Sequence, residues 1–375
     1  MAGIYIHIPF CKQACHYCDF HFSTSLKNKD AFLVALVKEI ELQKNYFDTF
    51  EIINTIYFGG GTPSLLSEKE IELIIEPLHK YFTIDNHAEI TLEANPDDLT
   101  PSKLNDLSRT PINRLSIGIQ SFFDEDLKWM NRAHNSSQAS SAVKNAQDKG
   151  FENITIDLIY GTPTLSNENW TENLQRTFDF KIKHISAYCL TIEPKTVLGH
   201  QLKNKMIESI DEQKSAVQFE KMLEEMKKNN FVQYEISNFC VGDNYSKHNS
   251  NYWLRQNYLG LGPSAHSFNG ISRRWNISNN ALYIKALESN TINYTGEVLS
   301  KSQQYNEYIL TSLRTFWGTD LTYIKKHFGS NFVATCIKEV QPYIMNNQVQ
   351  LLEDKLFLTD KGKLFADKIT SDLFF

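Results

Sequence analysis

The chain has 375 residues, of which 41% are hydrophobic and 22% are charged, and its formal net charge is −6. These values are typical of a globular chain that can bury a large core and hold more than one domain. They disfavour nucleic acid as a partner, because no basic excess exists to neutralise phosphates, and no apolar run approaches the roughly 20 residues that span a bilayer.

The N-terminal sequence MAGIYIHIPF predicts no secretory signal peptide, because it has neither a basic segment nor a long apolar one. We therefore expect a cytoplasmic protein without stable membrane insertion. Structural disulfides are disfavoured in that compartment, so the six cysteines need another explanation.

Six short β-rich runs alternate with longer amphipathic stretches up to about residue 236. The predicted strands are residues 4–8, 55–58, 89–93, 114–119, 154–159 and 184–190. Because a helical segment separates each strand from the next, we expect the strands to pair in parallel. The pattern predicts an α/β fold, either a partial barrel or a doubly wound sheet.

The helical segments between these strands begin and end at recognisable residues. Ser67 and Glu70 form a capping box that predicts a helix to about residue 81. Thr100 is followed by proline, which suits the first turn of a helix. Gly150 is expected to end a helix that begins near residue 137, and Asp211 to open a long one.

The alternation stops near residue 236. Residues 237–275 are rich in Asn, Ser, Gly and aromatic side chains, which predicts a functional loop. Residues 301–375 are expected to form helices, a short hairpin around VQLLEDKLFLT and a last helix over 360–370, the order of a winged-helix-like module. We therefore divide the chain into residues 1–236, a linking region 237–300 and a C-terminal domain 301–375.

Three of the six cysteines, Cys11, Cys15 and Cys18, lie within eight positions directly after the first strand. A structural zinc site normally takes four ligands in two separated pairs, and the remaining cysteines lie far away. Zinc stays an alternative, because His7, His16 or His21 could complete such a site. Iron–sulfur clusters are held by thiolates on tight loops, and three ligands on a four-iron cube leave one iron open to a small molecule.

Polar features follow each of the predicted strands. They are the cysteine loop, the Gly59-Gly60-Gly61-Thr62-Pro63 run, Glu93, Gln120, Asp157 and Thr191. In parallel α/β folds ligands bind at the carboxyl ends of the strands, so these features are expected to face one cavity. Each has a structural alternative as well: a tight turn for the glycines, an ion pair for Glu93, and a tied strand end for Gln120.

The spacing Cys-x3-Cys-x2-Cys, with Tyr17 before the last cysteine, resembles that of the radical S-adenosylmethionine superfamily. This resemblance implies a [4Fe-4S] cluster whose open iron binds S-adenosylmethionine and reduces it to a 5′-deoxyadenosyl radical. The protein would position the cofactors and exclude water, while the cofactors supply the chemistry. Thr62 and exposed amides of the glycine run would receive the amino and carboxylate groups of S-adenosylmethionine, and Asp157 its ribose.

The segments YIHIPFC, GGGTP, SIGIQSF, NRAH and DLIYGTP together resemble the oxygen-independent coproporphyrinogen III oxidase family, over nearly the whole chain. The resemblance implies a partial (β/α)6 barrel with a C-terminal α+β, winged-helix-like domain. It implies Cys11, Cys15 and Cys18 as cluster ligands. The implied contacts of S-adenosylmethionine are Tyr5, Tyr17, Gly60, Gly61, Thr62, Glu93, Gln120, Arg132 and Asp157, although Arg132 could equally be a solvated helix charge.

Two departures from the oxidases favour the heme chaperone (HemW) branch of this family. The oxidases carry an N-terminal arm before the cysteine motif and a further cysteine two positions after the third, whereas Tyr5 lies almost at the start here and position 20 is Phe. The sequence HNSNYW at 248–253 also resembles the HNxxYW motif of that branch. His248 would be the axial ligand of a heme, with Tyr252 and Trp253 against the porphyrin. Alternatively, His248 bonds a loop carbonyl and the aromatic residues belong to the core.

The sequence therefore predicts a protein that binds a [4Fe-4S] cluster, S-adenosylmethionine and heme, and that delivers heme to acceptors such as respiratory enzymes. An electron donor is implied, and the resemblance is compatible with a homodimer. Two alternatives stay open. One is an enzyme that decarboxylates coproporphyrinogen III to protoporphyrinogen IX, and the other is a binding protein organised by zinc.

Overall fold

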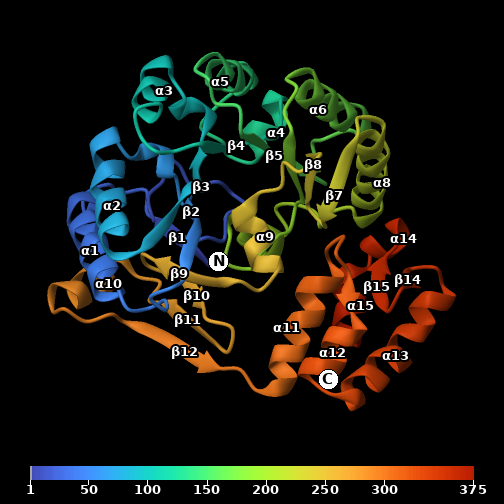
Figure 1. The fold of residues 1–375 in the computed structure, drawn as a ribbon. Coiled ribbons are helices and arrows are strands. Elements are labelled where there is room, and N and C mark those ends of the chain that lie inside the picture. Colours follow the sequence, from blue (N-terminus) through green and yellow to red (C-terminus); the bar gives the residue numbers. More distant parts are fainter. Residues whose placement is uncertain (1) are drawn as a thin grey trace.

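The computed structural model describes residues 2–375, and its centre is an open, strongly curved sheet (Figure 1). The six strands of the curve run in parallel, as the sequence predicts, and they lie in chain order. They are β1 (Ala2–Ile8), β2 (Ile52–Gly60), β3 (Thr83–Ala94), β4 (Arg114–Gln120), β5 (Ile154–Tyr160) and β6 (His184–Cys189). This is the partial (β/α)6 barrel, and the fold class is confirmed.

Helices cover the outer face of the curve (Figure 1). They are α1 (Lys29–Leu42), α2 (Glu68–Tyr81), α3 (Pro101–Leu107), α5 (Ser136–Asp148), α6 (Asn167–Asp179) and α8 (Glu212–Lys228). Helices α4 (Asp124–Trp129) and α7 (Val197–Lys203) belong instead to a smaller hydrophobic cluster, against which Tyr17 of the cysteine loop packs. The predicted caps are present, since Ser67, Thr100 and Asp211 each accept a hydrogen bond from the first turn of their helix. Gly150 follows α5 with φ of +93°, which suits glycine.

Alternation along each strand separates the core from the cavity. On β1, Ile4, Ile6 and Ile8 are fully buried in the main hydrophobic core. Tyr5, between them, lines the interior of the barrel instead. Successive side chains of a strand point to opposite faces. The outward residues therefore pack under the helices, and the inward ones are left for a site.

The region 237–300 is mostly regular structure, so the prediction of a functional loop over 237–275 is wrong. Strands β8 (Asn238–Val241) and β7 (Phe231–Glu235) continue the sheet beyond β6. At the other edge β9 (Asn257–Leu261) pairs in parallel with β1. It is followed by β10 (His266–Phe268), β11 (Ser272–Asn276), α10 (Asn280–Glu288) and β12 (Tyr294–Val298). The polar composition of this region did not indicate its strands, because their partners lie far away in the sequence.

A short helix, α9 (Lys247–Trp253), closes the inner end of the barrel (Figure 1). Its His248 approaches Gly3 and Thr55, which face the interior from β1 and β2. The backbone N–H of His248 also donates to Glu89 of β3 at 3.1 Å. The HNxxYW segment is therefore a helix that lies against three strands of the barrel.

The C-terminal residues form a second hydrophobic core, drawn in red in Figure 1. Its elements are α11 (Lys301–Leu313), β13 (Thr319–Asp320), α12 (Leu321–His327), α13 (Ser330–Met345), β14 (Val349–Leu352), β15 (Lys355–Leu358), α14 (Asp360–Lys363) and α15 (Ala366–Asp372). The predicted hairpin is β14 with β15. The predicted last helix is divided into α14 and α15. Division of the chain at residues 236 and 300 stays a prediction.

Among residues 2–375, no helix combines the length and the apolar character that crossing a membrane requires.

Candidate functional site

A cavity of about 770 Å³ occupies the interior of the barrel and opens at the carboxyl ends of the strands. Its lining includes every residue that the sequence predicts as a cluster ligand or as a contact of S-adenosylmethionine, together with His248. These are Cys11, Cys15, Cys18, Tyr5, Tyr17, Gly60, Gly61, Thr62, Glu93, Gln120, Arg132, Asp157 and His248. Residues that are up to 243 positions apart in the sequence, counted from Tyr5 to His248, thus face one space.

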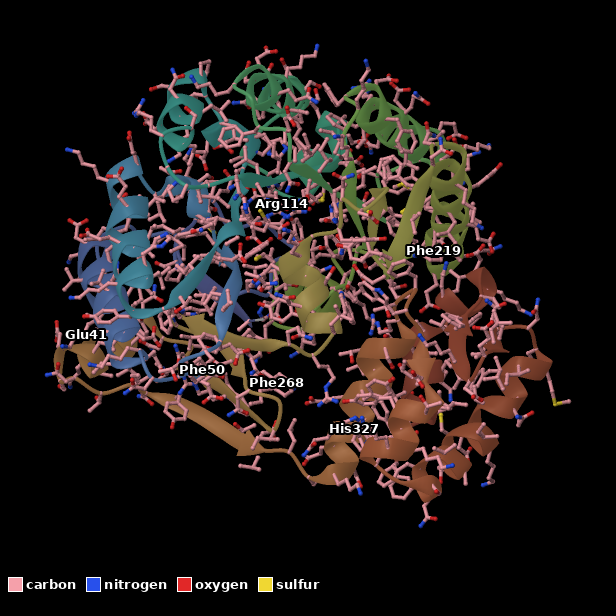
Figure 2. The ribbon with its side chains drawn as sticks, in the orientation of Figure 1. Glu41, Phe50, Arg114, Phe219, Phe268 and His327 are labelled. Carbon is pink, nitrogen blue, oxygen red and sulfur yellow. The ribbon has the colours of Figure 1, made fainter. Side chains whose placement is uncertain are left out.

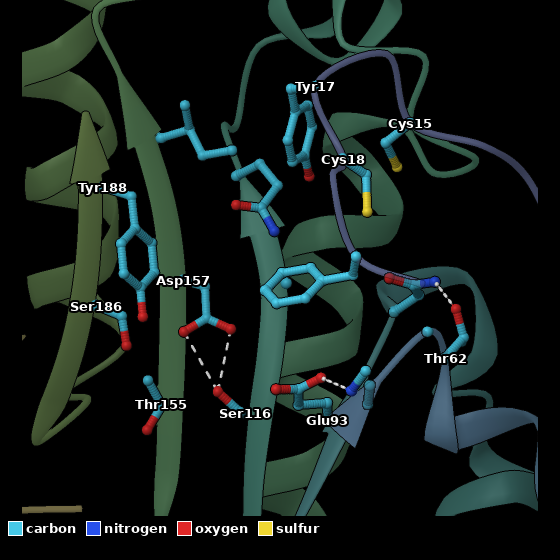
Figure 3. A pocket seen from close by; sticks show the side chains of 18 of the residues that line it. Cys15, Tyr17, Cys18, Thr62, Glu93, Ser116, Thr155, Asp157, Ser186 and Tyr188 are labelled. Atoms are coloured by element: carbon cyan, nitrogen blue, oxygen red, sulfur yellow. Dashed lines mark hydrogen bonds between the residues drawn. The ribbon is translucent and has the colours of Figure 1, made fainter. Parts of the chain in front are cut away.

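The cysteine loop lies between β1 and α1 at the mouth of this cavity. All three of its thiols are free and half-buried, and Figure 3 shows the sulfur atoms of Cys15 and Cys18 pointing into the cavity. Across residues 2–375, no three His, Cys, Asp or Glu side chains converge on a position suited to a single metal ion. Three free thiols that line one cavity would fit separate corners of an iron–sulfur cluster.

The glycine run packs directly against the start of the cysteine loop. A Cβ on Gly61 would lie 2.6 Å from the carbonyl oxygen of Phe10, so only glycine fits there. The N–H of Gly61 donates to Ile8 and that of Thr62 to Phe10, at 2.9 and 2.7 Å. The prediction that these amides are exposed is therefore wrong. The amides of Gly61 and Thr62 hold the two loops together, and the Gly60 amide donates to Glu93 at 3.1 Å.

Two carboxylates, Glu93 of β3 and Asp157 of β5, lie inside the cavity on either side of β4 (Figure 3). Glu93 accepts from the Tyr57 hydroxyl at 2.8 Å rather than pairing with a lysine. Burial raises its pKa to about 7, with a further contribution from Asp157, although the Tyr57 hydrogen bond lowers it. Asp157 accepts from Ser116 at 3.0 and 3.2 Å, and burial raises its pKa to about 6. The buried carboxylates of Glu93 and Asp157 therefore favour a ligand that is cationic or that neutralises their charge.

Arg132 is a half-buried side chain beyond the end of α4, so the alternative of a solvated helix charge is wrong. Its guanidinium donates to Asn95 at 2.7 Å and to the carbonyl of Gly118 at 2.8 Å. It also lies 3.3 Å from both the Cys15 sulfur and the Tyr17 hydroxyl. A buried cation thus stands beside the thiols, where it stabilises negative charge.

His248 is almost fully buried, and both of its ring nitrogens have partners. Nδ1 lies 2.8 Å from the Thr55 hydroxyl and Nε2 lies 2.9 Å from the Tyr252 hydroxyl. Burial, with a contribution from the charge of Arg114, lowers its pKa to about 3, so the imidazole is neutral. The ring also stacks on Tyr57, at 4.9 Å between centroids. The predicted bond to a loop carbonyl is therefore replaced by two hydroxyl partners.

Several residues of the cavity were missed from the sequence. They are Tyr57, Asn95, Arg114, Ser116, Thr155, His184, Ser186, Tyr188, Asn238 and Asn249, with others around them. Several of them stand at an even spacing along one strand, as Thr155 does with Asp157, Ser116 with Gln120, and His184 with Ser186 and Tyr188, and side chains at that spacing share a face. This period-2 pattern could have identified them once the strands were known.

Comparison with known proteins places this geometry in a family. Residues 5–176 match the profile of the radical SAM superfamily, and residues 299–365 match the HemN C-terminal domain. A protein of Lactococcus lactis named heme chaperone HemW is 33% identical over 96% of this chain and 93% of its own length. The chain belongs to the HemW family of radical SAM proteins.

Other relatives of the HemW family extend this match. A Bacillus subtilis protein with the same name is 30% identical, with 98% of both chains covered. Among solved structures, the coproporphyrinogen III oxidase HemN of Escherichia coli superimposes with a TM-score of 0.86, covering 99% of this chain and 89% of its own. Its identity is only 22%, so this likeness concerns the fold.

Radical SAM membership implies a [4Fe-4S] cluster and S-adenosylmethionine, and the residues of this HemW-family chain fit both groups. Three free thiols surround an open space at the mouth of the cavity. Next to it, Arg132 has one N–H, at Nε, that is buried without a hydrogen-bond partner. The carboxylates of Glu93 and Asp157 lie deeper. Anionic and cationic groups are thus both present for a zwitterionic cofactor with a positive sulfonium.

Proposed function

We propose that this protein is a heme chaperone that binds a [4Fe-4S] cluster, S-adenosylmethionine and heme, and passes the heme to acceptor proteins. The observation that carries the proposal is the match to relatives named heme chaperone HemW over nearly the full length of both chains. Phe20, in place of a further cysteine after Cys18, supports the same branch.

Different residues of the cavity would bind each of the two cofactors. Cys11, Cys15 and Cys18 would hold the cluster, which supplies an electron for cleaving the sulfonium when both cofactors are bound. Arg132 would donate to the carboxylate of S-adenosylmethionine through its Nε–H, which has no partner among residues 2–375. Deeper in the cavity, Asp157 accepts hydrogen bonds from ribose hydroxyls in this proposal. The enclosing barrel excludes water from the reacting groups.

His248 is the candidate ligand of the heme iron. Its neutral ring suits a metal, because only the unprotonated nitrogen can coordinate. Ligation through Nε2 requires that the hydrogen bond to Tyr252 be given up. Tyr5 and Tyr57 lie beside it as aromatic walls, with stacked rings whose centroids are 6.1 Å apart. Trp253, predicted to face the porphyrin, does not line the cavity; the guanidinium of Arg314 lies 5.8 Å from its ring centroid.

A cytoplasmic location, respiratory enzymes as acceptors, an electron donor and a homodimer complete the proposal as predictions from the sequence. Nothing in the net charge of −6 favours a nucleic acid.

An assay of product separates the chaperone from the oxidase. The protein is reconstituted anaerobically with iron and sulfide and incubated with coproporphyrinogen III, a reductant and S-adenosylmethionine. We expect no protoporphyrinogen IX, whereas heme added to the same preparation binds stoichiometrically and moves to an added apo-acceptor. Formation of protoporphyrinogen IX would replace the proposal by the enzymatic alternative.

The affinity for S-adenosylmethionine is expected to fall below about pH 7. Glu93 has a pKa of about 7 because it is buried, so its charge, which attracts the cationic cofactor, is lost as the pH falls. Between pH 8 and pH 6 we expect a roughly tenfold loss of affinity by calorimetry. The Glu93→Gln variant should bind more weakly at pH 8 and vary much less over this range. A variant with the wild-type pH profile would exclude Glu93 as the titrating group.

A further inference from the structure

The inner end of the cavity contains a buried arginine that has no part in holding the cluster or S-adenosylmethionine. Arg114 begins β4 and is only 2% exposed, yet it lines the cavity. Figure 2 labels it in the middle of the barrel. Burying a guanidinium is costly unless hydrogen bonds and an opposite charge compensate it.

The hydrogen bonds of Arg114 are incomplete. Of its five N–H groups, only one on Nη2 donates to a partner among residues 2–375, the Thr155 hydroxyl. Nε is buried without a hydrogen-bond partner. The nearest carboxylate oxygen, on Glu89, is 3.7 Å from Nε, which is an ion pair but too long for a hydrogen bond. The guanidinium therefore retains donors for which the described part of the chain has no acceptor.

Glu89 does not supply the missing acceptors, because its other oxygen already accepts the His248 N–H at 3.1 Å. The remaining neighbours are mostly neutral. Burial lowers the pKa of both His184 and His248, and the charge of Arg114 lowers them further. Asp157, two positions along β5 from Thr155, is the other charged group that acts on Arg114. An acceptor with two oxygens would suit the open part of the guanidinium.

This arginine lies far from the cluster end of the cavity. Arg114 and Gln120 stand at opposite ends of β4, and a strand of this length extends about 20 Å. Gln120 is at the same end as Thr62 and the cysteine loop, whereas Arg114 lies near α9 and His248. A carboxylate bound at Arg114 thus belongs to a second ligand, whose other atoms extend toward the aromatic wall of Tyr57 and His248.

We infer that Arg114 anchors a carboxylate of the cavity's second ligand; resting on the proposed function, this is a propionate of the heme. The propionate accepts hydrogen bonds from the open N–H groups of the guanidinium. This contact fixes the orientation of the porphyrin, because one edge of the ring is held at the closed end of the barrel while the face approaches His248. Arg114 is a binding residue in this inference and takes no part in bond making.

The test compares heme with heme dimethyl ester, in which both propionates are esterified. We expect wild-type protein to bind heme about 10- to 100-fold more tightly than the ester in spectroscopic titrations, as for hydrogen bonds to a charged group. In the Arg114→Met/Glu89→Gln variant the ratio should fall to about 2-fold or less. Both charges are removed together in this variant, so that no unpaired carboxylate stays buried.

The surface pair Arg176 and Glu172, which lie 2.8 Å apart, provides the matched control. The Arg176→Met/Glu172→Gln variant should keep the wild-type ratio. Cluster content and S-adenosylmethionine binding show whether each variant is folded. If the double variant is not folded, Arg114→Lys replaces it. A smaller ratio of heme to ester affinity is expected there, because a single ammonium cannot form the two parallel hydrogen bonds of a guanidinium. An unchanged ratio in a folded variant, or equal binding of heme and ester by the wild type, overturns the inference alone. Failure of the wild type to bind heme at all overturns the proposed function as well.

Discussion

Replacing Cys15 by alanine is expected to reduce the cluster content of anaerobically reconstituted protein to background. Each thiolate would hold one corner of the cube, and two thiolates do not retain it. The two histidines of the loop each have one ring nitrogen in a hydrogen bond already. The ring nitrogens of His16 and His21 lie 3.1 and 2.7 Å from the Trp129 carbonyl and the Asn280 side chain. Iron and sulfide analysis, together with the brown absorbance, measures the loss.

Cys189→Ala is the matched control, because Cys189 also lines the cavity but lies outside the cysteine loop. It should keep full iron, sulfide and absorbance. Analysis of zinc in the same samples tests the alternative metal. Stoichiometric zinc without iron in the wild type, or an intact cluster in Cys15→Ala, would refute the assignment of the three thiols.

Replacing His248 by alanine is expected to weaken heme binding by about 100-fold or more. Loss of an outer-shell partner of a metal ligand already costs 10- to 100-fold in affinity, and here the ligand itself is removed. The imidazole, with a pKa of about 3, stays neutral across the physiological range. Heme affinity of the wild type should therefore show no step between pH 6 and pH 8 that arises from His248. A spectroscopic heme titration measures both expectations.

Two further variants separate iron ligation from a structural role of His248. Tyr252→Phe removes the hydroxyl that occupies Nε2, so heme affinity should stay equal or become tighter by up to about tenfold. His134→Ala removes another buried histidine, one that lies outside the cavity and whose Nε2 is 3.0 Å from the Ile119 carbonyl. It should leave heme binding unchanged. Wild-type heme spectra in His248→Ala, or a loss of affinity in Tyr252→Phe as large as in His248→Ala, would contradict ligation through Nε2.

The fold could be predicted where short-range signals carry it. The capping box at Ser67, the N-cap at Thr100 and the positive φ of Gly150 depend on residues within a few positions of each other. The six strands were predicted in the same way, and their parallel pairing follows from the helices between them. The region from 237 to 275 could not be predicted in this way. Its strand β9 pairs with β1 at the other end of the sequence, with Asn257 opposite Ala2. Composition alone does not reveal such a partner.

The site was predicted at the ends of the strands and missed along their length. The sequence marks Glu93 and Asp157, because each interrupts an apolar run. It does not mark Arg114 or Ser116, because a polar residue on a strand is equally suited to the surface. Only the curvature of the sheet turns that face inward, and then every second residue of β4 lines the cavity.

The sequence by itself determined the alternation of strands and helices and the branch of the family, and it predicts the cluster ligands, because all three depend on the identity and spacing of neighbouring residues. The tertiary structure decided which groups meet. It places His248 against Thr55, 193 positions away, leaves Arg114 with open donors beside Glu89, and uses the amides of Gly61 and Thr62 to join two loops. These contacts depend on the register and closure of the sheet, which bring distant segments together.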